Sequence, residues 1–381
     1  MRTFYLPTEV ITGRGCLAEL GRVTARYGRR AMLVCGAHFA RRSGLLDRAL
    51  GLLRGPGVEV TVYDAVQGEA DLATVEAGIT LAREHGVDVL VGLGGGSAMD
   101  TAKAIAGLVK LPGSVWEYHA GRPLEGPGVP LITVPTTAGS GAEVTKNAVL
   151  IDPRQGKKES IRDDRWFARV ALVDPETTLP LPPEITASTG SDALCQAIEA
   201  FTSLGAGPVT DALAMRAIAL IGQNLVRACT QGSDLGAREG MSMGSLLAGM
   251  AMASARLGGV HGMAHPLGSH FDIPHGVVCG LLLPYTMAYN LDYATEKYAL
   301  VAQLLGESTA GLSIREAAQR AVERVRELLT QVGVPQHLGA FGVTEAAFPR
   351  IIAESLPSSS LQHNPRPLQA EDVRQILQMA L

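Results

Sequence analysis

The sequence predicts an α/β domain with a parallel sheet over residues 1–180, followed by an all-helical domain over residues 181–381. Two observations lead to this division. In the first part, short apolar runs rich in β-forming residues alternate with helical patterns, which is typical of a parallel sheet covered on both faces. After residues 177–184, a stretch with three prolines that is typical of a linker, only helical patterns follow. A chain of 381 residues is also long enough for two cores.

The predicted elements follow from these patterns in chain order. The strands are expected at residues 31–35, 57–63, 87–93, 130–134 and 170–173. The helices between them are expected at about residues 40–53, 71–85 and 97–109. Asp71 is a suitable N-cap for the second of these helices, and Gly86 can terminate it. In the second part, helices are expected at residues 186–203, 209–229, 236–256, 275–289, 293–305, 313–331 and 370–380.

The composition argues against nucleic-acid and membrane partners. Lys and Arg total 33, Asp and Glu total 37, and the net charge is −4, so the chain lacks the basic surface that binds a phosphate backbone. No apolar run reaches the ~20 residues that span a bilayer, and the start of the sequence lacks the apolar segment of a secretory signal. The five cysteines are scattered without a CxxC pair, which favours reduced thiols and a cytoplasmic location.

The first candidate site is a glycine-rich turn between a strand and a helix. Gly94, Gly95 and Gly96 follow the apolar run at 87–93, and Ser97 opens a helical pattern. Consecutive glycines allow a tight turn that brings backbone N–H groups up to an anion, and the positive end of the following helix favours a pyrophosphate there. The absence of a following GK[ST] argues against a P-loop nucleotide triphosphatase. A tight turn without a ligand is the alternative.

The second candidate site follows another buried strand. Residues 133–143 carry four hydroxyl side chains and two glycines. Buried hydroxyls need hydrogen-bond partners, and at the carboxyl end of a parallel strand they would line the ligand crevice of the sheet. A solvent-exposed turn rich in Ser and Thr is the alternative.

A histidine cluster lies in the second part of the chain. Four histidines fall within 15 residues, namely His261, His265, His270 and His275. On a helix, His261 and His265 share one face, and so do Asp192 and Gln196 upstream. Two imidazoles, one carboxylate and a further oxygen ligand would suit Zn²⁺ or Fe²⁺. The spacing alone does not join Asp192 to the histidines.

Taken together, these motifs resemble the iron-containing (group III) alcohol dehydrogenase family. The matching stretches are GGGSAMDTAK (94–103), TVPTTAGSGAEVT (133–145), ALVDPETTLPLPPEITASTGSDAL (171–194), IEAF (198–201) and GVHGMAHPLGSHFDIPHGVVCGLLLP (259–284). The similarity covers nearly the whole chain. It implies an NAD(P)-dependent oxidoreductase whose first domain binds the dinucleotide and whose second domain holds a divalent metal.

The resemblance also implies roles for individual residues. The positions that match cofactor contacts are Gly95, Gly96, Ser97, Thr136, Thr137, Lys158 and Leu179. Asp192, His261 and His275 match three of the four metal ligands. His265 matches a histidine that lines the substrate site, and an imidazole there would serve as a proton relay because it titrates near neutrality.

Gln196 departs from the family pattern. The family's fourth ligand is usually a histidine four residues after the aspartate, and Gln196 stands at that position. A carboxamide oxygen is a harder and usually weaker ligand than imidazole for a transition metal. Either the site holds its metal with lower affinity, with Gln196 as the fourth ligand, or the protein works without a tightly held metal.

A second departure concerns the cofactor. Many family members carry an aspartate after the strand that corresponds to residues 31–35, where it binds the adenosine ribose and disfavours a 2′-phosphate. Residues 36–42 contain no acid here, and Arg41 or Arg42 could pair with a phosphate. We therefore expect NAD or NADP, with NADP or dual use favoured, and Fe²⁺ rather than Zn²⁺.

The expected function is hydride transfer between a nicotinamide and a small alcohol or its aldehyde or ketone at a divalent metal. One alternative is a metal-independent reductase of the same superfamily, similar to maleylacetate reductase. Another, of a different class, is a nucleotide-binding protein without turnover. The resemblance implies a homodimer or a higher homo-oligomer, pairing through an N-terminal strand at Thr3–Ile11.

Overall fold

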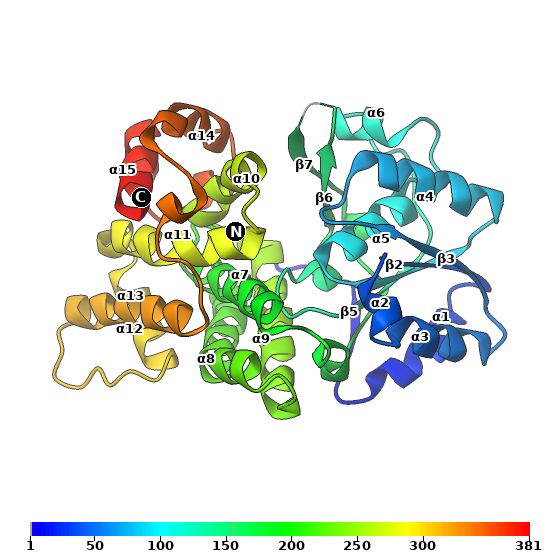
Figure 1. The fold of residues 1–381 in the computed structure, drawn as a ribbon, viewed down its shortest axis with the longest axis horizontal. Helices are drawn as coiled ribbons and strands as arrows, with labels where there is room; N and C mark the ends of the chain where they lie inside the picture. The colour runs from blue at the N-terminus through cyan, green and yellow to red at the C-terminus, as the bar shows by residue number, and fades with distance from the viewer. Residues whose placement is uncertain (1, 155) are drawn as a thin grey trace. The chain divides into compact units, whose positions relative to one another are not determined.

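The computed structural model describes residues 2–154 and 156–381. The chain divides into two compact units. The first, here called the sheet unit, comprises Leu6–Thr137 and Gly141–Pro180. The second, here called the helical unit, comprises Met1–Tyr5, Ala138–Ser140 and Leu181–Leu381. Figure 1 shows the α/β character of one unit and the helical character of the other, which confirms the predicted fold class.

The sheet unit is built on a six-stranded parallel sheet with the strand order β1-β8-β5-β4-β2-β3. Its strands are β1 (Glu9–Thr12), β2 (Arg30–Gly36), β3 (Glu59–Val66), β4 (Val89–Gly94), β5 (Leu131–Pro135) and β8 (Val170–Val173). The five predicted strands are all confirmed. The chain runs outward from β2 to β3 and then returns to β4 beside β2, so the order reverses between β2 and β4. Ligands bind at such a switch point, outside the carboxyl ends of the strands.

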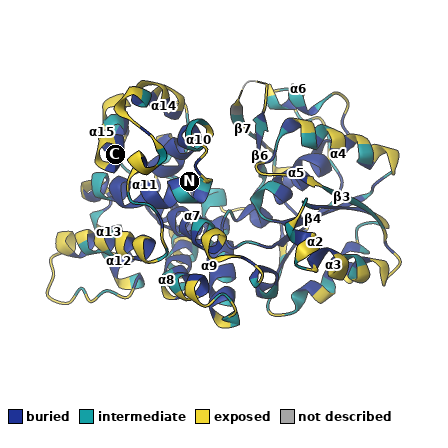
Figure 2. Cartoon of the chain, viewed as in Figure 1, coloured by how far each residue is buried: buried dark blue, intermediate teal, exposed yellow. Residues whose placement is uncertain are grey.

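Alternating side chains of β2 fill two separate cores, one on each face of the sheet. Met32 and Val34 pack in a cluster with α4 (Leu72–Glu84) and α5 (Gly96–Leu108). Leu33 packs on the other face with α3 (Leu45–Arg54). Because both faces are covered, β4, β5 and β8 are buried along their whole length. Figure 2 shows the buried residues of these strands.

The predicted signals at the ends of α4 are confirmed. The Asp71 carboxylate caps the helix by accepting a hydrogen bond from the Thr74 backbone N–H at 2.8 Å. Gly86 follows the last turn with a φ of +56°, a conformation that glycine adopts without steric cost.

Other elements differ from the sequence prediction. The antiparallel hairpin of β6 (Asn147–Asp152) and β7 (Lys157–Arg162) was not expected. The strand expected at Thr3–Ile11 is limited to β1, which pairs in parallel with β8 at one edge of the sheet. The expected linker 177–184 overlaps a 3-10 helix at Pro175–Thr178 and the start of α7 at Pro183. Proline is well tolerated in the first turn of a helix.

The helical unit is assembled around α7. Its helices are α7 (Pro183–Thr202), α8 (Pro208–Thr230), α9 (Leu235–Ala255), α10 (Gly259–Phe271), α11 (His275–Tyr289), α12 (Thr295–Leu304), α13 (Ile314–Gln331), α14 (Phe348–Ser355) and α15 (Ala370–Ala380). Helix α14 was not predicted, and α10 was considered only as a possible setting for the histidine pair. Residues Gly190 to Thr202 of α7 are all buried, so its polar side chains must find partners inside the unit.

Helix α8 alone among the described helices is long and apolar enough to cross a membrane by length and composition. Its inward side chains, including Ile218, Ile221 and Leu225, belong to the core of the helical unit. Arg216 is exposed on another face. This amphipathic distribution is that of a core helix of a globular unit.

Two helical glycines in the sheet unit should respond in opposite ways to alanine. A Cβ at Gly107 would lie 2.2 Å from the Trp166 indole, so Gly107→Ala should lower the free energy of unfolding by about 1–3 kcal/mol. A Cβ at Gly51 of α3 meets open space, so Gly51→Ala should raise it by about 0.5–1 kcal/mol. Urea titration followed by tryptophan fluorescence measures both, because Trp116 and Trp166 are the two tryptophans of the chain. Equal effects of the two substitutions would contradict this account.

Candidate metal centre and cofactor loops

The glycine-rich turn lies where β4 meets α5. Gly95 is the N-cap of α5, and Gly96 and Ser97 are its first residues. The backbone N–H groups of a first helical turn have no partner within the helix and can bind an anion. Gly94, Gly95 and Gly96 all have negative φ, so a left-handed backbone is not what requires glycine at these positions. Close packing explains Gly94 instead, since a Cβ there would lie 2.6 Å from the Cβ of Ala98.

The loop after β5 lies beside this turn. The Thr136 backbone N–H donates a hydrogen bond to the Gly94 carbonyl oxygen at 2.9 Å. Thr137 is near enough to Gly95 that a Cβ there would meet its side chain at 3.3 Å. The structure therefore brings together the two polar loops, because the strands that precede them, β4 and β5, are neighbours in the sheet.

The two other predicted cofactor contacts lie in the same unit. Lys158 is on β7, and its Nζ is 2.5 Å from a carboxylate oxygen of Glu69. Leu179 follows the 3-10 helix Pro175–Thr178, and its N–H donates to the Glu176 carbonyl oxygen. Lys158 is therefore already paired, and any anion that it binds competes with Glu69.

Buried charged side chains of α5 bind the second polar loop, residues 133–143, and the strand β6 that follows it. Lys103 of α5 donates to the carbonyl oxygens of Ala142 at 3.0 Å and Asn147 at 2.7 Å. Asp100 accepts from the Val149 backbone N–H at 3.0 Å. Burial raises the pKa of Asp100 and raises the pKa of Glu143 to about 7, while it lowers the pKa of Lys103. This network fixes the loop and β6 to α5.

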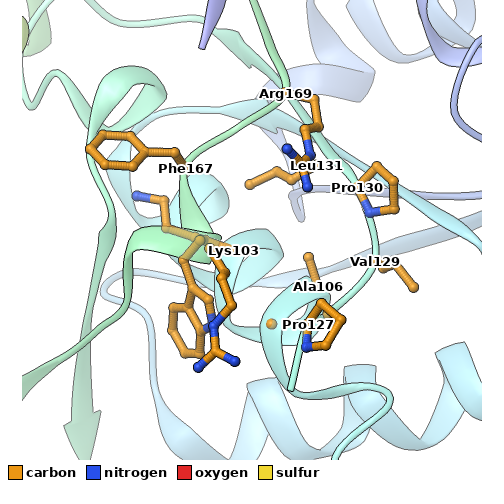
Figure 3. Close-up of a pocket in the computed structure, with 12 residues that line it drawn as sticks. Lys103, Ala106, Pro127, Val129, Pro130, Leu131, Phe167 and Arg169 are labelled. Carbon is orange, nitrogen blue, oxygen red and sulfur yellow. The ribbon is translucent and has the colours of Figure 1, made fainter. Parts of the chain in front are cut away.

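A pocket of the sheet unit is formed by other residues. Side chains from α5 and from segments 127–131 and 165–169 line it, among them Lys103, Trp166 and Arg169 (Figure 3). The predicted cofactor-binding residues are not among those that line it. It is therefore distinct from the two polar loops.

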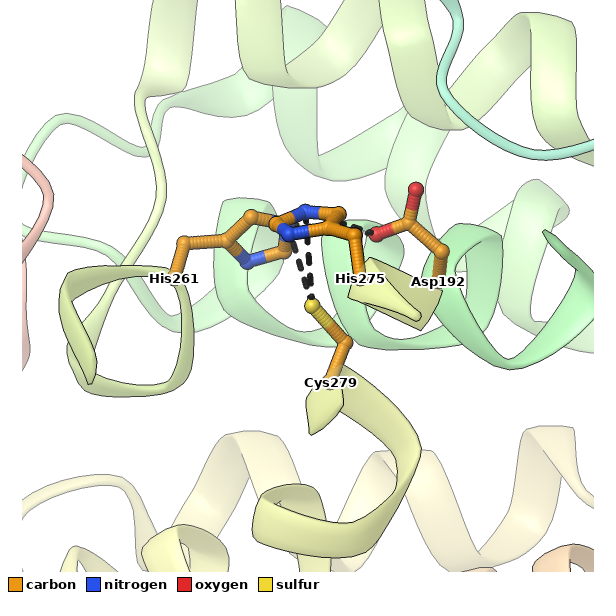
Figure 4. Close-up of side chains that lie close together, drawn as sticks. All are labelled: Asp192, His261, His275 and Cys279. Carbon is orange, nitrogen blue, oxygen red and sulfur yellow. Dashed lines mark hydrogen bonds and ion pairs between the residues drawn. The ribbon is translucent and has the colours of Figure 1, made fainter. Parts of the chain in front are cut away.

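The helical unit brings three predicted metal ligands together. Asp192 projects from α7, His261 from α10 and His275 from α11 (Figure 4). The Asp192 Oδ1 lies 3.3 Å from the Nε2 of His261 and 3.8 Å from the Nε2 of His275. These atoms belong to a group whose ligand atoms all lie within 4.8 Å of one another.

The connection between α10 and α11 brings the histidines together. Asp272 ends α10 in the left-handed conformation, with φ +50° and ψ +38°, and Pro274 precedes α11. The chain therefore reverses within three residues. His275 then lies against both His261 and His265, at ring-centroid distances of 5.5 and 5.4 Å.

His270, the remaining histidine of the cluster, has a different partner. Its Nε2 lies 2.8 Å from a carboxylate oxygen of Glu354 on α14. His265 instead stacks on His275 with an angle of 23° between the rings. Three of the four clustered histidines thus form one group, and His270 joins α10 to α14.

Glu199 fixes the orientation of His261. One oxygen of the Glu199 carboxylate is 2.6 Å from the His261 Nδ1, and the other accepts from the Val260 backbone N–H at 2.7 Å. A carboxylate at Nδ1 holds the proton there and leaves the Nε2 lone pair free for a metal. The Nε2 atom is the one that faces Asp192.

Gln196 orients Asp192 through its amide nitrogen and leaves its carboxamide oxygen available for a ligand. Its Nε2 donates to the Asp192 Oδ2 at 2.9 Å. Among the described residues, the buried Asp192 Oδ1 and Gln196 Oε1 have no hydrogen-bond partner. Buried oxygens without partners are costly, and a cation would satisfy both. The donor set therefore fits a divalent metal.

Two buried cysteines beside the histidines were missed by the sequence interpretation. The Cys279 Sγ lies 3.8 Å from the His261 Nε2 and 3.6 Å from the His275 Nε2. The Cys195 Sγ lies 3.8 Å from the His261 Nδ1. A usable signal was the i, i+4 spacing of His275 and Cys279, which places both on one face of a helix.

The cluster is electrostatically coupled. Burial opposes ionisation of the Cys279 thiol, but a hydrogen bond with Cys195 and the charges of His275 and His261 hold its pKa well below the usual range. Burial likewise opposes protonation of His261, but Cys279, Asp192 and Glu199 raise its pKa well above the usual range. Groups of this kind release protons when a metal binds.

Comparison with known proteins shows the family of the chain. The model described as iron-containing alcohol dehydrogenase matches residues 7–175, and the C-terminal model of the Fe-containing alcohol dehydrogenase family matches residues 186–381. The chain is 38% identical over 382 residues to a 1,3-propanediol dehydrogenase of Klebsiella pneumoniae, covering 100% of the chain and 99% of that protein. It is 34% identical over 381 residues to an NAD-dependent methanol dehydrogenase of Bacillus methanolicus, covering all of both.

A solved structure described as 1,3-propanediol oxidoreductase superposes with a TM-score of 0.97 at 38% identity, covering 100% of both chains. The chain belongs to the iron-containing alcohol dehydrogenase family. The resemblance inferred from the motifs is confirmed. As a member of this family the chain is an alcohol and aldehyde oxidoreductase that uses a nicotinamide cofactor.

In this alcohol dehydrogenase, the buried Glu143 of the second polar loop should make the free energy of unfolding depend on pH. The pKa of Glu143 is about 7, against a usual value of 4.5, so the native state holds an extra proton between these pH values. Wild-type stability should therefore fall relative to Glu143→Gln as the pH rises through this window. Between pH 5 and pH 8, we expect the free energy of unfolding of the wild type to fall by about 2–3 kcal/mol relative to that of Glu143→Gln.

Urea titrations of the two proteins at several pH values, followed by tryptophan fluorescence, measure this difference. Glu125→Gln at an exposed position of the same unit is the control. A difference between wild type and Glu143→Gln that stays constant with pH would contradict the prediction.

Proposed function

We propose that the chain interconverts a small primary or secondary alcohol and its aldehyde or ketone by hydride transfer at a divalent metal. The observation that carries this proposal is the buried convergence of the Asp192 Oδ1 with the Nε2 atoms of His261 and His275. One carboxylate and two imidazoles form a donor set that suits Fe²⁺ or Zn²⁺. The family favours Fe²⁺.

The proposed metal-holding residues are Asp192, Gln196, His261 and His275. Gln196 would contribute its Oε1, which is buried without a hydrogen-bond partner among the described residues. When bound, a divalent metal acts as a Lewis acid on a carbonyl oxygen, and the nicotinamide supplies or accepts the hydride. Glu199 holds the His261 ring with Nε2 toward Asp192, so the donor atoms are oriented in advance.

His265 is the proposed catalytic residue. It is partly buried, one helical turn from His261, and stacked on His275. An imidazole at this position would move a proton to or from the alcohol oxygen, because imidazole serves as a general acid and base. The stacking limits rotation of the ring and keeps it beside the donor cluster.

The proposed dinucleotide-binding residues lie in the sheet unit. The N–H groups of Gly95, Gly96 and Ser97 at the start of α5 would bind the pyrophosphate. Thr136 and Thr137 supply hydroxyls from the adjoining loop, with Lys158 and Leu179 as further contacts. On this basis, residues 1–180 form the dinucleotide-binding domain, and residues 181–381 form the metal and substrate domain.

The proposed cofactor is NAD with use of NADP as well. Residues 36–42 carry no acid to repel a 2′-phosphate. Arg41, one of the two arginines available to bind that phosphate, pairs with Asp64 of β3 at 2.8 Å through its Nε. Arg42 is exposed. Because Asp64 already neutralises Arg41, Arg41 attracts a 2′-phosphate less strongly, and use of both NAD and NADP is the better-supported proposal.

The proposed setting is a homodimer or higher homo-oligomer in the cytoplasm, without nucleic-acid or membrane partners. Strand β1 ends the sheet, and in the described part of the chain no further strand follows it. An open edge of this kind is able to pair with a second copy. The five cysteines are free thiols in the structure, as a reducing compartment would keep them.

The proposed function is tested on protein purified anaerobically. Metal content is measured by elemental analysis, and oxidation of NADH and NADPH by small aldehydes is followed before and after chelation. We expect near-stoichiometric metal and activity that is lost on chelation and restored by metal. His261→Ala should reduce kcat/KM about 10³-fold or more, since the metal contributes several kcal/mol to the barrier.

A second candidate function, a metal-independent reductase, is favoured by Gln196 in place of a histidine. Full activity without bound metal, in wild type and in a folded His261→Ala variant, would establish this second function and overturn the first. Cofactor binding without any turnover of alcohols or aldehydes would instead indicate a nucleotide-binding protein.

His265→Asn tests the proton relay. We expect kcat to fall about 10²–10⁴-fold and the limb of the pH profile near neutrality to disappear, because asparagine cannot titrate. Metal content should remain at the wild-type value. His270→Asn is the matched control, since His270 lies on the same helix but pairs with Glu354. An unchanged pH profile in His265→Asn would assign the proton transfer to another group.

A further inference from the structure

The distances around Cys279 are close to those of a tetrahedral metal site. With Zn–N bonds of about 2.0–2.1 Å and a Zn–S bond of about 2.3 Å, a nitrogen and an oxygen ligand lie about 3.4 Å apart, and a nitrogen and a sulfur ligand lie about 3.6 Å apart. The Asp192 Oδ1 lies 3.3 Å from the His261 Nε2 and 3.8 Å from the His275 Nε2. The Cys279 Sγ lies 3.6 Å from the His275 Nε2 and 3.8 Å from the His261 Nε2. The sulfur therefore lies beside the three other donor atoms (Figure 4).

Gln196 is the other candidate for the fourth ligand. Its amide group is bonded to the outer oxygen of Asp192 at 2.9 Å, which turns the inner oxygen toward the histidines. The side chain therefore already has a positioning role. The set of Asp192, His261, His275 and Cys279 is complete without it, and Asp192, His261 and Cys279 are all buried.

We propose that the Cys279 sulfur is a protein ligand of the metal in this chain and stands in for the imidazole that Gln196 lacks. This inference rests on the proposed metal centre. A thiolate is a softer donor than a carboxamide oxygen and raises the affinity for Zn²⁺ and Co²⁺ relative to Fe²⁺. The chain would thus keep a tightly held metal despite Gln196.

Cys195 provides a matched control within the same cluster. It is also a fully buried thiol, and its Sγ lies 3.8 Å from His261, the same distance as the Cys279 Sγ. Its contact is with the Nδ1, which already has Glu199 as a partner at 2.6 Å. Cys195 therefore contacts His261 at the nitrogen that does not face Asp192, and it also hydrogen-bonds Cys279. We assign it no ligand role.

The test uses Co²⁺ loaded into chelated, full-length protein. Wild type should show the intense near-ultraviolet sulfur-to-cobalt charge-transfer band of a thiolate ligand, and Cys195→Ser should keep it. Cys279→Ser should lose the band and bind Zn²⁺ and Co²⁺ at least about tenfold more weakly, with a smaller loss for Fe²⁺. A wild-type spectrum without the sulfur band overturns the inference.

X-ray absorption of the zinc-loaded wild type requires no variant and covers the case in which Cys279→Ser fails to fold. One sulfur at about 2.3 Å is expected, and a shell of nitrogen and oxygen alone overturns the inference. In the Cys279→Ser background, Gln196→His should restore affinity without restoring the band. Failure of this rescue would show that the sulfur does not replace the imidazole.

The outcomes separate this inference from the proposed function. If metal binds and activity is metal-dependent but no sulfur is detected, the inference falls and the proposed function stands. If His261→Ala leaves Co²⁺ affinity unchanged, the metal is bound elsewhere and both fall.

Discussion

The helical unit is organised by the need to satisfy polar side chains on the buried helix α7. Asp192, Gln196 and Glu199 occupy successive turns of a helix that is buried from Gly190 onward, and each would be costly without partners. Glu199 engages both the backbone at the start of α10 and the ring of His261. The start of α10 is therefore held by the same carboxylate that orients the donor atom of His261.

The two units prepare their sites by different physical means. In the sheet unit the candidate anion site is made of backbone N–H groups at a strand end, and the close approach of Gly94 to Ala98 and of Thr136 to Gly94 gives it its shape. Buried charges such as Lys103 serve as supports there. In the helical unit the candidate site is made of side chains from three helices. Backbone sites depend on where strands end, whereas side-chain sites depend on how helices pack.

This difference explains what could be predicted from the sequence. The strands β2, β3, β4, β5 and β8 were found because each contains a run of apolar, β-forming residues, and the loops after β4 and β5 follow directly from these strands. The β6–β7 hairpin was missed because Lys157–Arg162 carries mainly polar residues. Helix α10 is rich in glycine with an internal proline, and packing decides its conformation. The proximity of Cys279 to two imidazoles was missed because a buried cysteine is usually a small apolar residue, although its i, i+4 spacing from His275 places both on one helix face.

The left-handed turn at Asp272 has a consequence for how such a chain can vary in length. The connection between α10 and α11 has three residues, and the reversal that it makes brings His275 back against His261 and His265. An insertion there would carry His275 away from the ring of His261, which Glu199 of α7 holds in place. Exposed connections such as residues 306–313 face no such requirement. The interval of fourteen positions from His261 to His275 is thus a fixed length of the fold, while surface loops are free to lengthen or shorten.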